Sequence, residues 1–526
     1  MYFFFERVKM ANTDFLYKPR DWRSIDLWKD VTPEEWYDSK WQLRNLIKDV
    51  DTLAKVIKLN EYQFAETKRV IQTMHEQGKE PFRITPYYAS LMQEDPFHPK
   101  MLPGEDEENR LDPIFWQSVP TPAHLMFPDT GLEGAMDEEH RSYGSAYQRY
   151  PNRLALFVAE NTSCASYCTH CQRAKSLDEE HRISSEEINK GLFYINWNKN
   201  IEEVLITGGD ALMIGKKRLQ YILEELSKID HLRVIRIATR VPVVMPMAIT
   251  DDWLQLIKES GNRYSENNKK YIYFMTHLNH YHEITEDFRA CIERIHKAGF
   301  TIRNQTVFLR HVNSNFKTLG ETFRRMFWVG LEPYYLLQCH KERGIVHFIE
   351  PIQNGKIFMK NLQGWISGMM RPTYAANVEG GGGKIVLMPS THHTLGDETD
   401  IEDKIGPSQV YIQTWDKRDF HNYEALGRTT QKEYEESVKI MDKYIGREGI
   451  FAPCLILNDK DGHYIKTTNR DTLPKFSNTE KAHLFEYGAQ ENGMPITNPH
   501  VLCEELDKLY YENKAKEMQE TEIAVK

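Results

Sequence analysis

Short β-rich runs alternate with helical runs from Leu154 onward, and this alternation restricts the possible folds more than any other feature of the chain. Amphipathic stretches separate the β-rich runs, and the first of them opens with Ser184 and Glu187 in a capping-box arrangement. Strict alternation of strand and helix predicts an α/β fold whose parallel sheet has right-handed crossovers and is open or curled into a full or partial barrel. The predicted strands are Leu154-Ala-Leu-Phe-Val, Val204-Leu-Ile-Thr, Val234-Ile-Arg-Ile-Ala, Tyr271-Ile-Tyr-Phe-Met, Thr306-Val-Phe-Leu and Tyr334-Tyr-Leu-Leu, and the predicted helices span 184–197, 216–228, 251–260, 285–298 and 317–329.

Two further regions flank this segment. Residues 1–148 show helical spacing, as in Trp41-Gln-Leu-Arg-Asn, broken by proline-rich segments, and predict a helical N-terminal region. Residues 149–390 contain the strand and helix alternation. The alternation then fades, so we expect residues 391–526 to form a mixed C-terminal extension that provides an oligomer contact.

Composition excludes several classes of protein. Of the 526 residues, 27% are charged and 40% hydrophobic, as in ordinary folded proteins. No apolar run approaches the ~18 residues of a membrane-spanning helix. The net charge of −10, without a basic stripe, provides no surface for nucleic acid. We therefore expect a cytoplasmic protein that acts on small molecules, without a membrane or nucleic-acid partner.

Three of the seven cysteines follow the first predicted strand, as Cys164-Ala-Ser-Tyr-Cys168-Thr-His-Cys171. Three thiolates at this spacing suit three irons of a [4Fe–4S] cluster and leave the fourth iron open. S-adenosylmethionine can chelate that iron, and an electron from the cluster then breaks a carbon–sulfur bond to release a 5′-deoxyadenosyl radical. The alternative is a zinc site, for which His170 or His181 would have to supply a fourth ligand.

The second predicted strand ends in Gly208-Gly209-Asp210. Glycine at such a position lets the backbone approach a ligand closely. Alone, the motif is more often a tight turn between strand and helix. One βα unit after the cysteine cluster, it predicts the binding site for the amino-acid end of S-adenosylmethionine.

A second candidate site combines a lysine with two arginines. Gly380-Gly-Gly-Gly-Lys384 does not match a phosphate-binding P-loop, because its spacing is wrong and Ile385 follows the lysine. Lys384 could form a Schiff base with pyridoxal phosphate, although a solvated lysine on a flexible loop would be the better explanation of the motif taken by itself. The guanidinium groups of Arg149 and Arg153 suit a phosphate, and the alternative is two surface arginines.

Taken in order, these motifs resemble the lysine 2,3-aminomutase family of radical enzymes. The resemblance implies a six-stranded partial (β/α) barrel, a [4Fe–4S] cluster, S-adenosylmethionine and pyridoxal phosphate. It also implies that the substrate amino group moves from Cα to Cβ. The likeness runs from about Trp36 to Lys384 and includes Trp41-Gln-Leu-Arg-Asn, Ile84-Thr-Pro-Tyr-Tyr, Arg149-Tyr-Pro-Asn-Arg, Gly208-Gly-Asp-Ala-Leu, Thr276-His-Leu-Asn-His, Asn304-Gln, Pro333-Tyr-Tyr-Leu-Leu-Gln-Cys and Gly380-Gly-Gly-Gly-Lys.

The resemblance assigns roles to individual residues. Lys384 would carry the pyridoxal phosphate, Arg149 and Arg153 would hold its phosphate, and Arg173 would pair with the substrate α-carboxylate. It also implies an isomerase that takes electrons from a donor such as flavodoxin or ferredoxin and forms a homo-oligomer. A cysteine-rich zinc site that joins subunits in lysine-acting members is not expected here, because Cys454 and Cys503 are the only cysteines after residue 400.

Two departures from the family pattern concern the substrate. Where lysine-acting members have aspartates that neutralise the distal ammonium, this chain has His340 and Asn377. A buried ammonium without a counter-charge costs several kcal/mol, so we expect an acidic or polar amino acid, with glutamate first. Protonated His340, helped by Lys341, would pair with a distal carboxylate. Glu379 favours the alternative, which is lysine bound at an altered ammonium site.

Two other interpretations remain at this stage. The radical cluster could serve a different reaction, as in relatives that supply β-lysine for modifying a translation factor. The chain could also be an interaction protein whose cysteines hold zinc, with no enzymatic activity.

Overall fold

The computed structural model describes fourteen stretches of the chain, which together contain most of its first 390 residues. Among the helices in these stretches, none is both long enough and apolar enough to cross a bilayer. The described residues are 15–79, 82–100, 111–131, 138–159, 163–173, 183–265, 268–378, 382–387, 409–413, 420–424, 426–459, 464–467, 499–500 and 502–525.

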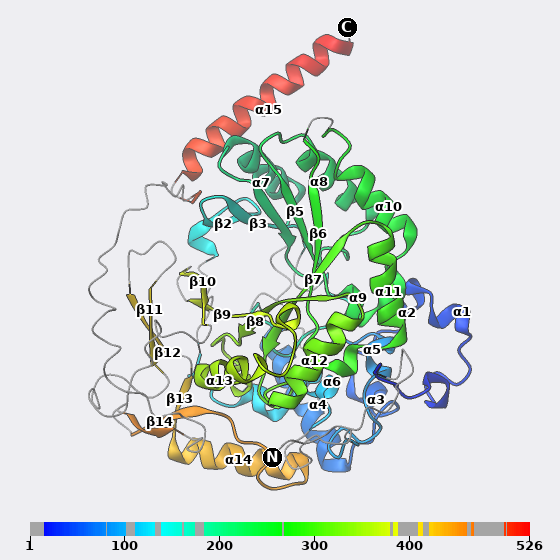
Figure 1. The fold of residues 1–526 in the computed structure, drawn as a ribbon, viewed down its shortest axis with the longest axis vertical. Coiled ribbons are helices and arrows are strands. Elements are labelled where there is room, and N and C mark those ends of the chain that lie inside the picture. The colour runs from blue at the N-terminus through cyan, green and yellow to red at the C-terminus, as the bar shows by residue number, and fades with distance from the viewer. Residues whose placement is uncertain are drawn as a thin grey trace.

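One ten-stranded sheet forms the centre of the molecule, with its strands paired in the order of the sequence (Figure 1). Strands β3 to β9 pair in parallel, while β1 and β2 at one edge and β10 at the other are antiparallel additions. The first and last strands do not pair with each other, so the sheet is an open, partial barrel. The strands are β1 (Ser142–Tyr143), β2 (Ala146–Tyr150), β3 (Arg153–Phe157), β4 (Glu203–Thr207), β5 (Val234–Ala238), β6 (Tyr271–Thr276), β7 (Thr301–Phe308), β8 (Glu332–Gln338), β9 (Thr373–Val378) and β10 (Gly383–Val386).

All six strands predicted from the sequence are present, as β3 to β8. The structure adds a seventh parallel strand, β9, that the sequence pattern did not predict. Its sequence, Thr-Tyr-Ala-Ala-Asn-Val, has little of the β-branched character typical of buried strands. Pairing with β8 and β10 on either side places it in the sheet despite this weak propensity.

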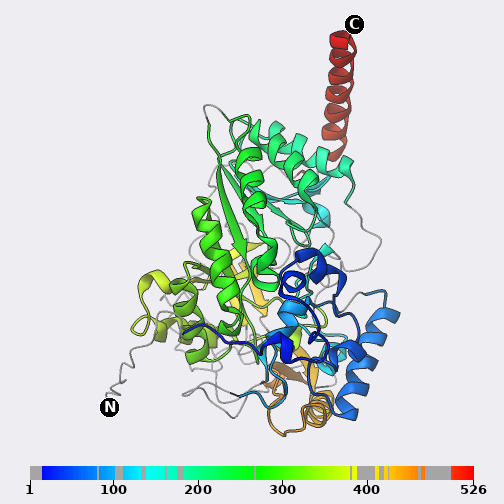
Figure 2. The same cartoon turned by 90° about the vertical axis from the view of Figure 1, so that its right-hand side faces the viewer.

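Helices connect the parallel strands and cover the outer face of the sheet (Figures 1 and 2). The capping box predicted at Ser184 is present: its hydroxyl accepts from the backbone N–H of Glu187, whose carboxylate accepts from the N–H of Ser184. All five helices predicted in this region are confirmed. They are α7 (Ser185–Trp197), α8 (Lys216–Ser227), α10 (Asp251–Ser260), α11 (Glu286–Lys297) and α12 (Phe316–Trp328), accompanied by the short α9 (Val241–Val244) and by α13 (Ile352–Leu362).

The two faces of the sheet differ in burial. In β3, β4 and β5, buried residues alternate with half-buried ones. The buried positions, such as Ile206 and Ile235, belong to the core cluster that includes apolar side chains of the outer helices. The alternate, half-buried positions face the inside of the partial barrel and include Arg153, Glu203 and Arg236. The inner face therefore carries charged side chains that could bind a substrate or a cofactor.

Further helices and strands lie before and after the sheet. The N-terminal helices are α1 (Pro33–Trp36), α2 (Ser39–Arg44), α3 (Val50–Leu53), α4 (Glu61–Glu76), α5 (Pro86–Ser90) and α6 (Pro113–Trp116). After the sheet come β11 (Gln409–Gln413), β12 (Phe420–Glu424), β13 (Gly427–Thr430), α14 (Gln431–Ile445), β14 (Leu455–Asn458), β15 (Tyr464–Thr467) and α15 (Cys503–Val525). Helix α15 contacts α7 at its start and then runs away from the rest of the molecule (Figures 1 and 2).

Candidate active site

The three clustered cysteines follow the carboxyl end of β3, as predicted, and influence one another electrostatically. Burial raises the pKa of Cys164, and the nearby charges of Asp210, Cys171 and Cys168 raise it further. Burial and Cys168 together raise the pKa of Cys171 to about 11. Thiols in this setting ionise only with a cation beside them, which iron would provide. The donor set therefore fits an iron–sulfur cluster.

The cysteines are gathered in one segment without standing in ligand positions. Among the described residues, no three His, Cys, Asp or Glu side chains meet the geometry of a bound metal ion. Of the two histidines considered as a fourth zinc ligand, His170 lies with its Nε2 at 3.3 Å from Nδ2 of Asn279. The other, His181, lies outside the described residues.

The Gly208-Gly209-Asp210 motif links the ends of three strands. A side chain at Gly208, which has φ +132°, would place its Cβ at 2.2 Å from the carbonyl oxygen of Ala159. The Asp210 carboxylate accepts from the Thr239 hydroxyl at 2.7 Å and from the backbone N–H of Arg240 at 2.7 Å. Asp210 thus ties the end of β4 to the end of β5. The role of this motif in binding S-adenosylmethionine stays a prediction. Because the Asp210 carboxylate is engaged with Thr239 and Arg240, the backbone of the turn would bind the cofactor.

Lys384 lies in β10 and points to the inner face of the barrel. Its Nζ donates to Oε1 of Gln305 at 3.1 Å and lies 5.0 Å from the centre of the Tyr335 ring. Its backbone N–H donates to the Tyr150 hydroxyl at 2.6 Å. These contacts with β2, β7 and β8 hold Lys384 in place. They argue against the alternative from the sequence, a solvated lysine on a flexible loop.

The ammonium form of Lys384 is disfavoured. Desolvation, followed by the positive charges of Arg236, Arg149 and Arg153, lowers the pKa of Lys384 to about 7, against a smaller opposing effect of Glu203. A lysine with such a pKa is half neutral at neutral pH and can act as a nucleophile. Three guanidinium groups beside it suit a phosphate. The residues therefore fit pyridoxal phosphate.

Arg236 was not among the residues predicted from the sequence. It lies in the middle of β5, on the inner face, and pairs with Glu203 at 2.6 Å. The available signal was a single charged residue inside the apolar run Val234-Ile-Arg-Ile-Ala. A charge at an inward position of a barrel strand is costly unless it has a partner or a ligand. This cost marks Arg236 as a candidate phosphate ligand beside Arg149 and Arg153.

The two substrate residues predicted from the family departures contact each other. Nδ2 of Asn377 lies 2.9 Å from Nε2 of His340, and both side chains are buried. Asn377 also pairs in register with Lys384 across the β9 and β10 hairpin, so their side chains share one face. Burial, Arg149 and Lys384 lower the pKa of His340 to about 4, so this imidazole is neutral in the free protein at pH 7.

Arg173 lies near the cysteines rather than near Lys384. Its backbone N–H donates to Sγ of Cys171 at 3.4 Å, and its guanidinium stacks over the Phe157 ring at 4.2 Å. The guanidinium also pairs with Glu138 at 3.2 Å. A substrate carboxylate at this position would have to share Arg173 with Glu138 or displace it.

Comparison with known proteins relates the chain to radical enzymes that move amino groups. The profile of the Radical SAM superfamily matches residues 161–325, which include the three cysteines. The chain is 35% identical to the L-lysine 2,3-aminomutase of Bacillus subtilis (strain 168), over 71% of this chain and 74% of that one. It is 35% identical to the L-lysine 2,3-aminomutase of Methanococcus maripaludis, over 69% and 78%. Identity to the glutamate 2,3-aminomutase of Clostridioides difficile (strain 630) is 34%, over 73% and 82%.

Proposed function

Because the chain belongs to the lysine 2,3-aminomutase family of radical S-adenosylmethionine enzymes, which are isomerases, we propose that it converts an L-α-amino acid to its β-isomer with pyridoxal phosphate as cofactor and glutamate as the favoured substrate. The proposal includes a [4Fe–4S] cluster on Cys164, Cys168 and Cys171. The zinc interpretation of these cysteines loses its basis, because the superfamily profile covers their segment.

The setting of Lys384 is the observation that carries the proposal. A neutral amine among Arg149, Arg153 and Arg236 is suited to hold an aldehyde that carries a phosphate. When bound there, pyridoxal phosphate supplies a conjugated system that delocalises an unpaired electron beside the substrate nitrogen. The protein contributes orientation: Gln305 and Tyr335 fix the position of the amine, and the guanidinium groups fix the phosphate.

The two cofactor sites lie toward opposite ends of β3. Arg153 is the first residue of this strand, and the cysteines follow its last residue, Phe157. Four steps of about 3.3 Å place roughly 13 Å between these ends. A substrate that lies between them has its α-carboxylate near Arg173, at the cysteine end, and its amino group toward Lys384. This arrangement would bring the substrate Cβ within reach of the radical source.

The pair of His340 and Asn377 would contact the distal group of the substrate. With Nε2 of His340 as acceptor, the Asn377 amide donates to it, and its Oδ1 is buried with no hydrogen-bond partner among the described residues. If the ring carries its proton on Nε2 and the amide is flipped, the free group is the NH₂ donor instead. The second arrangement suits a distal carboxylate, and binding of that anion would also raise the pKa of His340.

The first arrangement supports the second candidate, a lysine 2,3-aminomutase with an altered ammonium site. The unpartnered Oδ1 of Asn377 would accept a hydrogen bond from a distal ammonium. The Asn377 amide, however, cannot neutralise the charge of an ammonium group. Lys384 pairs in register with Asn377, and the positive charges of three guanidinium groups act on Lys384. The positive charges that lower the pKa of Lys384 would favour a carboxylate over an ammonium, so glutamate remains the first choice.

Anaerobic reconstitution followed by product analysis tests this proposal. The full chain, loaded with iron, sulfide and pyridoxal phosphate, is incubated with S-adenosylmethionine, dithionite and either glutamate or lysine. We expect the β-isomer of glutamate. Turnover of lysine alone would overturn the substrate assignment. Failure to form any β-amino acid from these or other amino acids, by protein with a full cluster, would overturn the proposed reaction.

A further inference from the structure

The guanidinium of Arg240 lies directly against one of the clustered cysteines. Arg240 follows the carboxyl end of β5, is 8% exposed, and donates from Nη1 to Sγ of Cys168 at 2.7 Å. Arg240 lies 72 residues after Cys168, so the sequence alone does not connect the two residues. A buried cation in contact with a predicted cluster ligand requires an explanation, because burial of a charge is costly unless the charge is used or balanced.

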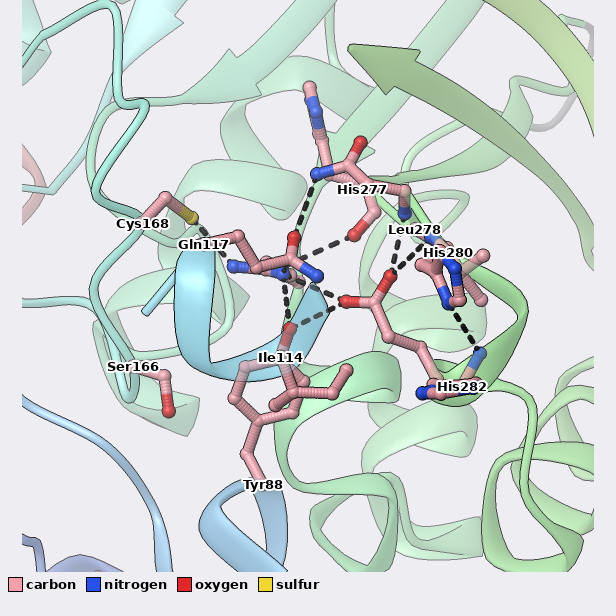
Figure 3. Close-up of polar contacts among 12 residues, drawn as sticks. Tyr88, Ile114, Gln117, Ser166, Cys168, His277, Leu278, His280 and His282 are labelled. Atoms are coloured by element: carbon pink, nitrogen blue, oxygen red, sulfur yellow. Dashed lines mark hydrogen bonds and ion pairs between the residues drawn. The ribbon is translucent and has the colours of Figure 1, made fainter. Parts of the chain in front are cut away.

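The rest of the guanidinium is held on every side. Its Nη2 lies 2.7 Å from the Tyr88 hydroxyl, 3.0 Å from Oε1 of Gln117 and 2.8 Å from Oε1 of Glu283, while its Nε donates to the carbonyl of His277 at 3.3 Å. Figure 3 shows Cys168, Gln117, Tyr88 and His277 converging on this point from different segments of the chain. With all these contacts made, the guanidinium has no alternative position.

Glu283 balances the charge and is itself anchored. It is fully buried, and its Oε1 also accepts from the Tyr88 hydroxyl at 2.6 Å. Its Oε2 accepts from the backbone N–H groups of Asn279 at 2.7 Å and His280 at 2.9 Å. Burial alone would lower the pKa of Arg240, but Cys168, Tyr88 and Glu283 outweigh it and hold this pKa above its ordinary value. An arginine guanidinium stays protonated at any working pH, so the charge beside Cys168 is fixed.

We propose that Arg240 is a positioning residue that raises the reduction potential of the cluster through its hydrogen bond to Sγ of Cys168, and that Glu283 limits this effect. The inference rests on the cluster of the proposed function. In the step concerned, one electron from a low-potential donor converts the oxidised cluster to the reduced one, without bond breaking or proton transfer. The reduced cluster carries one more negative charge, so a fixed cation at a ligand sulfur stabilises it relative to the oxidised state.

The two charges act in opposite directions, which distinguishes tuning from mere support of the fold. Loss of the Arg240 charge should make the cluster harder to reduce, whereas loss of the Glu283 charge should make it easier to reduce. Tyr88 supplies a control, because Tyr88→Phe removes hydrogen bonds from the same network without changing its charge. A purely structural network would not produce shifts of opposite sign with an unshifted neutral variant.

A potentiometric titration followed by electron paramagnetic resonance of the reduced cluster measures these shifts in reconstituted full-length protein. At the potential where the wild-type cluster is half reduced, we expect the ratio of reduced to oxidised cluster to fall about tenfold in Arg240→Gln, which is ~59 mV for one electron. Arg240→Lys should recover most of the loss. Glu283→Gln should shift the ratio the other way, and Tyr88→Phe should leave it within about twofold of the wild type.

Two outcomes would overturn the inference. One is a wild-type midpoint in Arg240→Gln protein that holds its full content of iron and sulfide. The other is an equal shift in Tyr88→Phe, which would point to structural support alone. If Arg240→Gln takes up no cluster, Glu283→Gln decides, since an unshifted or lower midpoint there contradicts the proposal. A wild-type protein that binds zinc and no sulfide would instead reject the proposed function itself.

Discussion

Two groups of charged side chains line the inside of the partial barrel, and they differ in how their charges are balanced. Around Arg240, a guanidinium, a carboxylate and neutral donors and acceptors satisfy one another, with a cysteine sulfur as the remaining contact. Around Lys384, the positive charges of Arg236, Arg149 and Arg153 have a larger effect on the amine than the negative charge of Glu203. Charges from both groups act on His277, since burial, Arg240 and Lys384 together lower the pKa of His277 to about 4.

The difference indicates what each group is built to hold. A balanced, fully bonded network is stable by itself and can fix the surroundings of a resident cluster. The positive charges that act on Lys384 would be offset by an arriving anion, so the second group suits a phosphate. Burial and these same charges lower the pKa of Lys384. Five substitutions or titrations test this contrast, in order of decreasing effect.

Removal of a cluster ligand should have the largest effect. Cys164→Ala is expected to lose the iron–sulfur cluster and all activity, because two thiolates cannot hold three irons. Iron and sulfide analysis with the visible absorbance spectrum measures this loss. The control is Cys291→Ala, since Cys291 is buried in α11 away from the site. A full cluster in Cys164→Ala, or its loss in the control, would show that the wrong cysteines were chosen.

Lys384→Ala should abolish covalent attachment of pyridoxal phosphate while the cluster remains. The visible absorbance of the attached cofactor, and its retention after denaturation and borohydride reduction, measure the effect. Lys270→Met is the matched control, because Lys270 is a buried lysine whose Nζ donates to the carbonyls of Ile229 and Leu232. If covalent attachment survives in Lys384→Ala, another lysine carries the cofactor and the charges around Lys384 serve some other purpose.

Arg236→Gln should weaken binding of pyridoxal phosphate roughly ten- to a hundredfold. A charge-assisted hydrogen bond to phosphate is worth about 1.5–3 kcal/mol, and this arginine is the strongest cationic influence on Lys384. Equilibrium binding of the cofactor measures the change. Arg303→Gln is the control, since Arg303 also pairs with a glutamate of the neighbouring strand, Glu332, at 2.7 Å. Equal losses in both variants would argue against a phosphate site at Arg236.

The rate of cofactor attachment should rise with pH through the pKa of Lys384, about 7. Only the neutral amine attacks an aldehyde, so the rate should increase about tenfold from pH 6 to pH 8 and then level off. Positive neighbours lower this pKa, so Arg236→Gln should move the midpoint to higher pH. Stopped-flow absorbance gives both profiles. A midpoint that does not move would mean that Arg236 does not contribute to the lowered pKa of Lys384.

The smallest expected effect concerns substrate choice. Asn377→Asp adds an anion beside His340 and in register with Lys384. The ratio of kcat/KM for lysine to that for glutamate should rise roughly tenfold, or about 1.4 kcal/mol. Asn377→Ala, which adds no charge, should lower turnover of both substrates without this change in preference. An unchanged ratio in Asn377→Asp would place the distal group of the substrate elsewhere.

Local signals in the sequence determined much of this protein. The β-rich runs, the amphipathic spacing and the capping residues depend on neighbours a few residues away, and they predicted β3 to β8 and the five main helices. The three cysteines lie within one short segment, so the cluster motif was visible without a fold. The family pattern then pointed to Lys384 and to the pair of arginines at 149 and 153.

Only the tertiary structure could bring distant residues together. The meaning of Arg236 depends on Glu203 and Lys384, and that of Arg240 on Cys168 and Glu283, which lie in other strands and loops. The register of β9 against β10 places Asn377 opposite Lys384, and His340, two residues after the end of β8, contacts Asn377. Charge balance inside the barrel is a sum over all such partners. No single segment contains that sum, so the sequence identified the cofactor motifs while the fold decided how their charges are balanced.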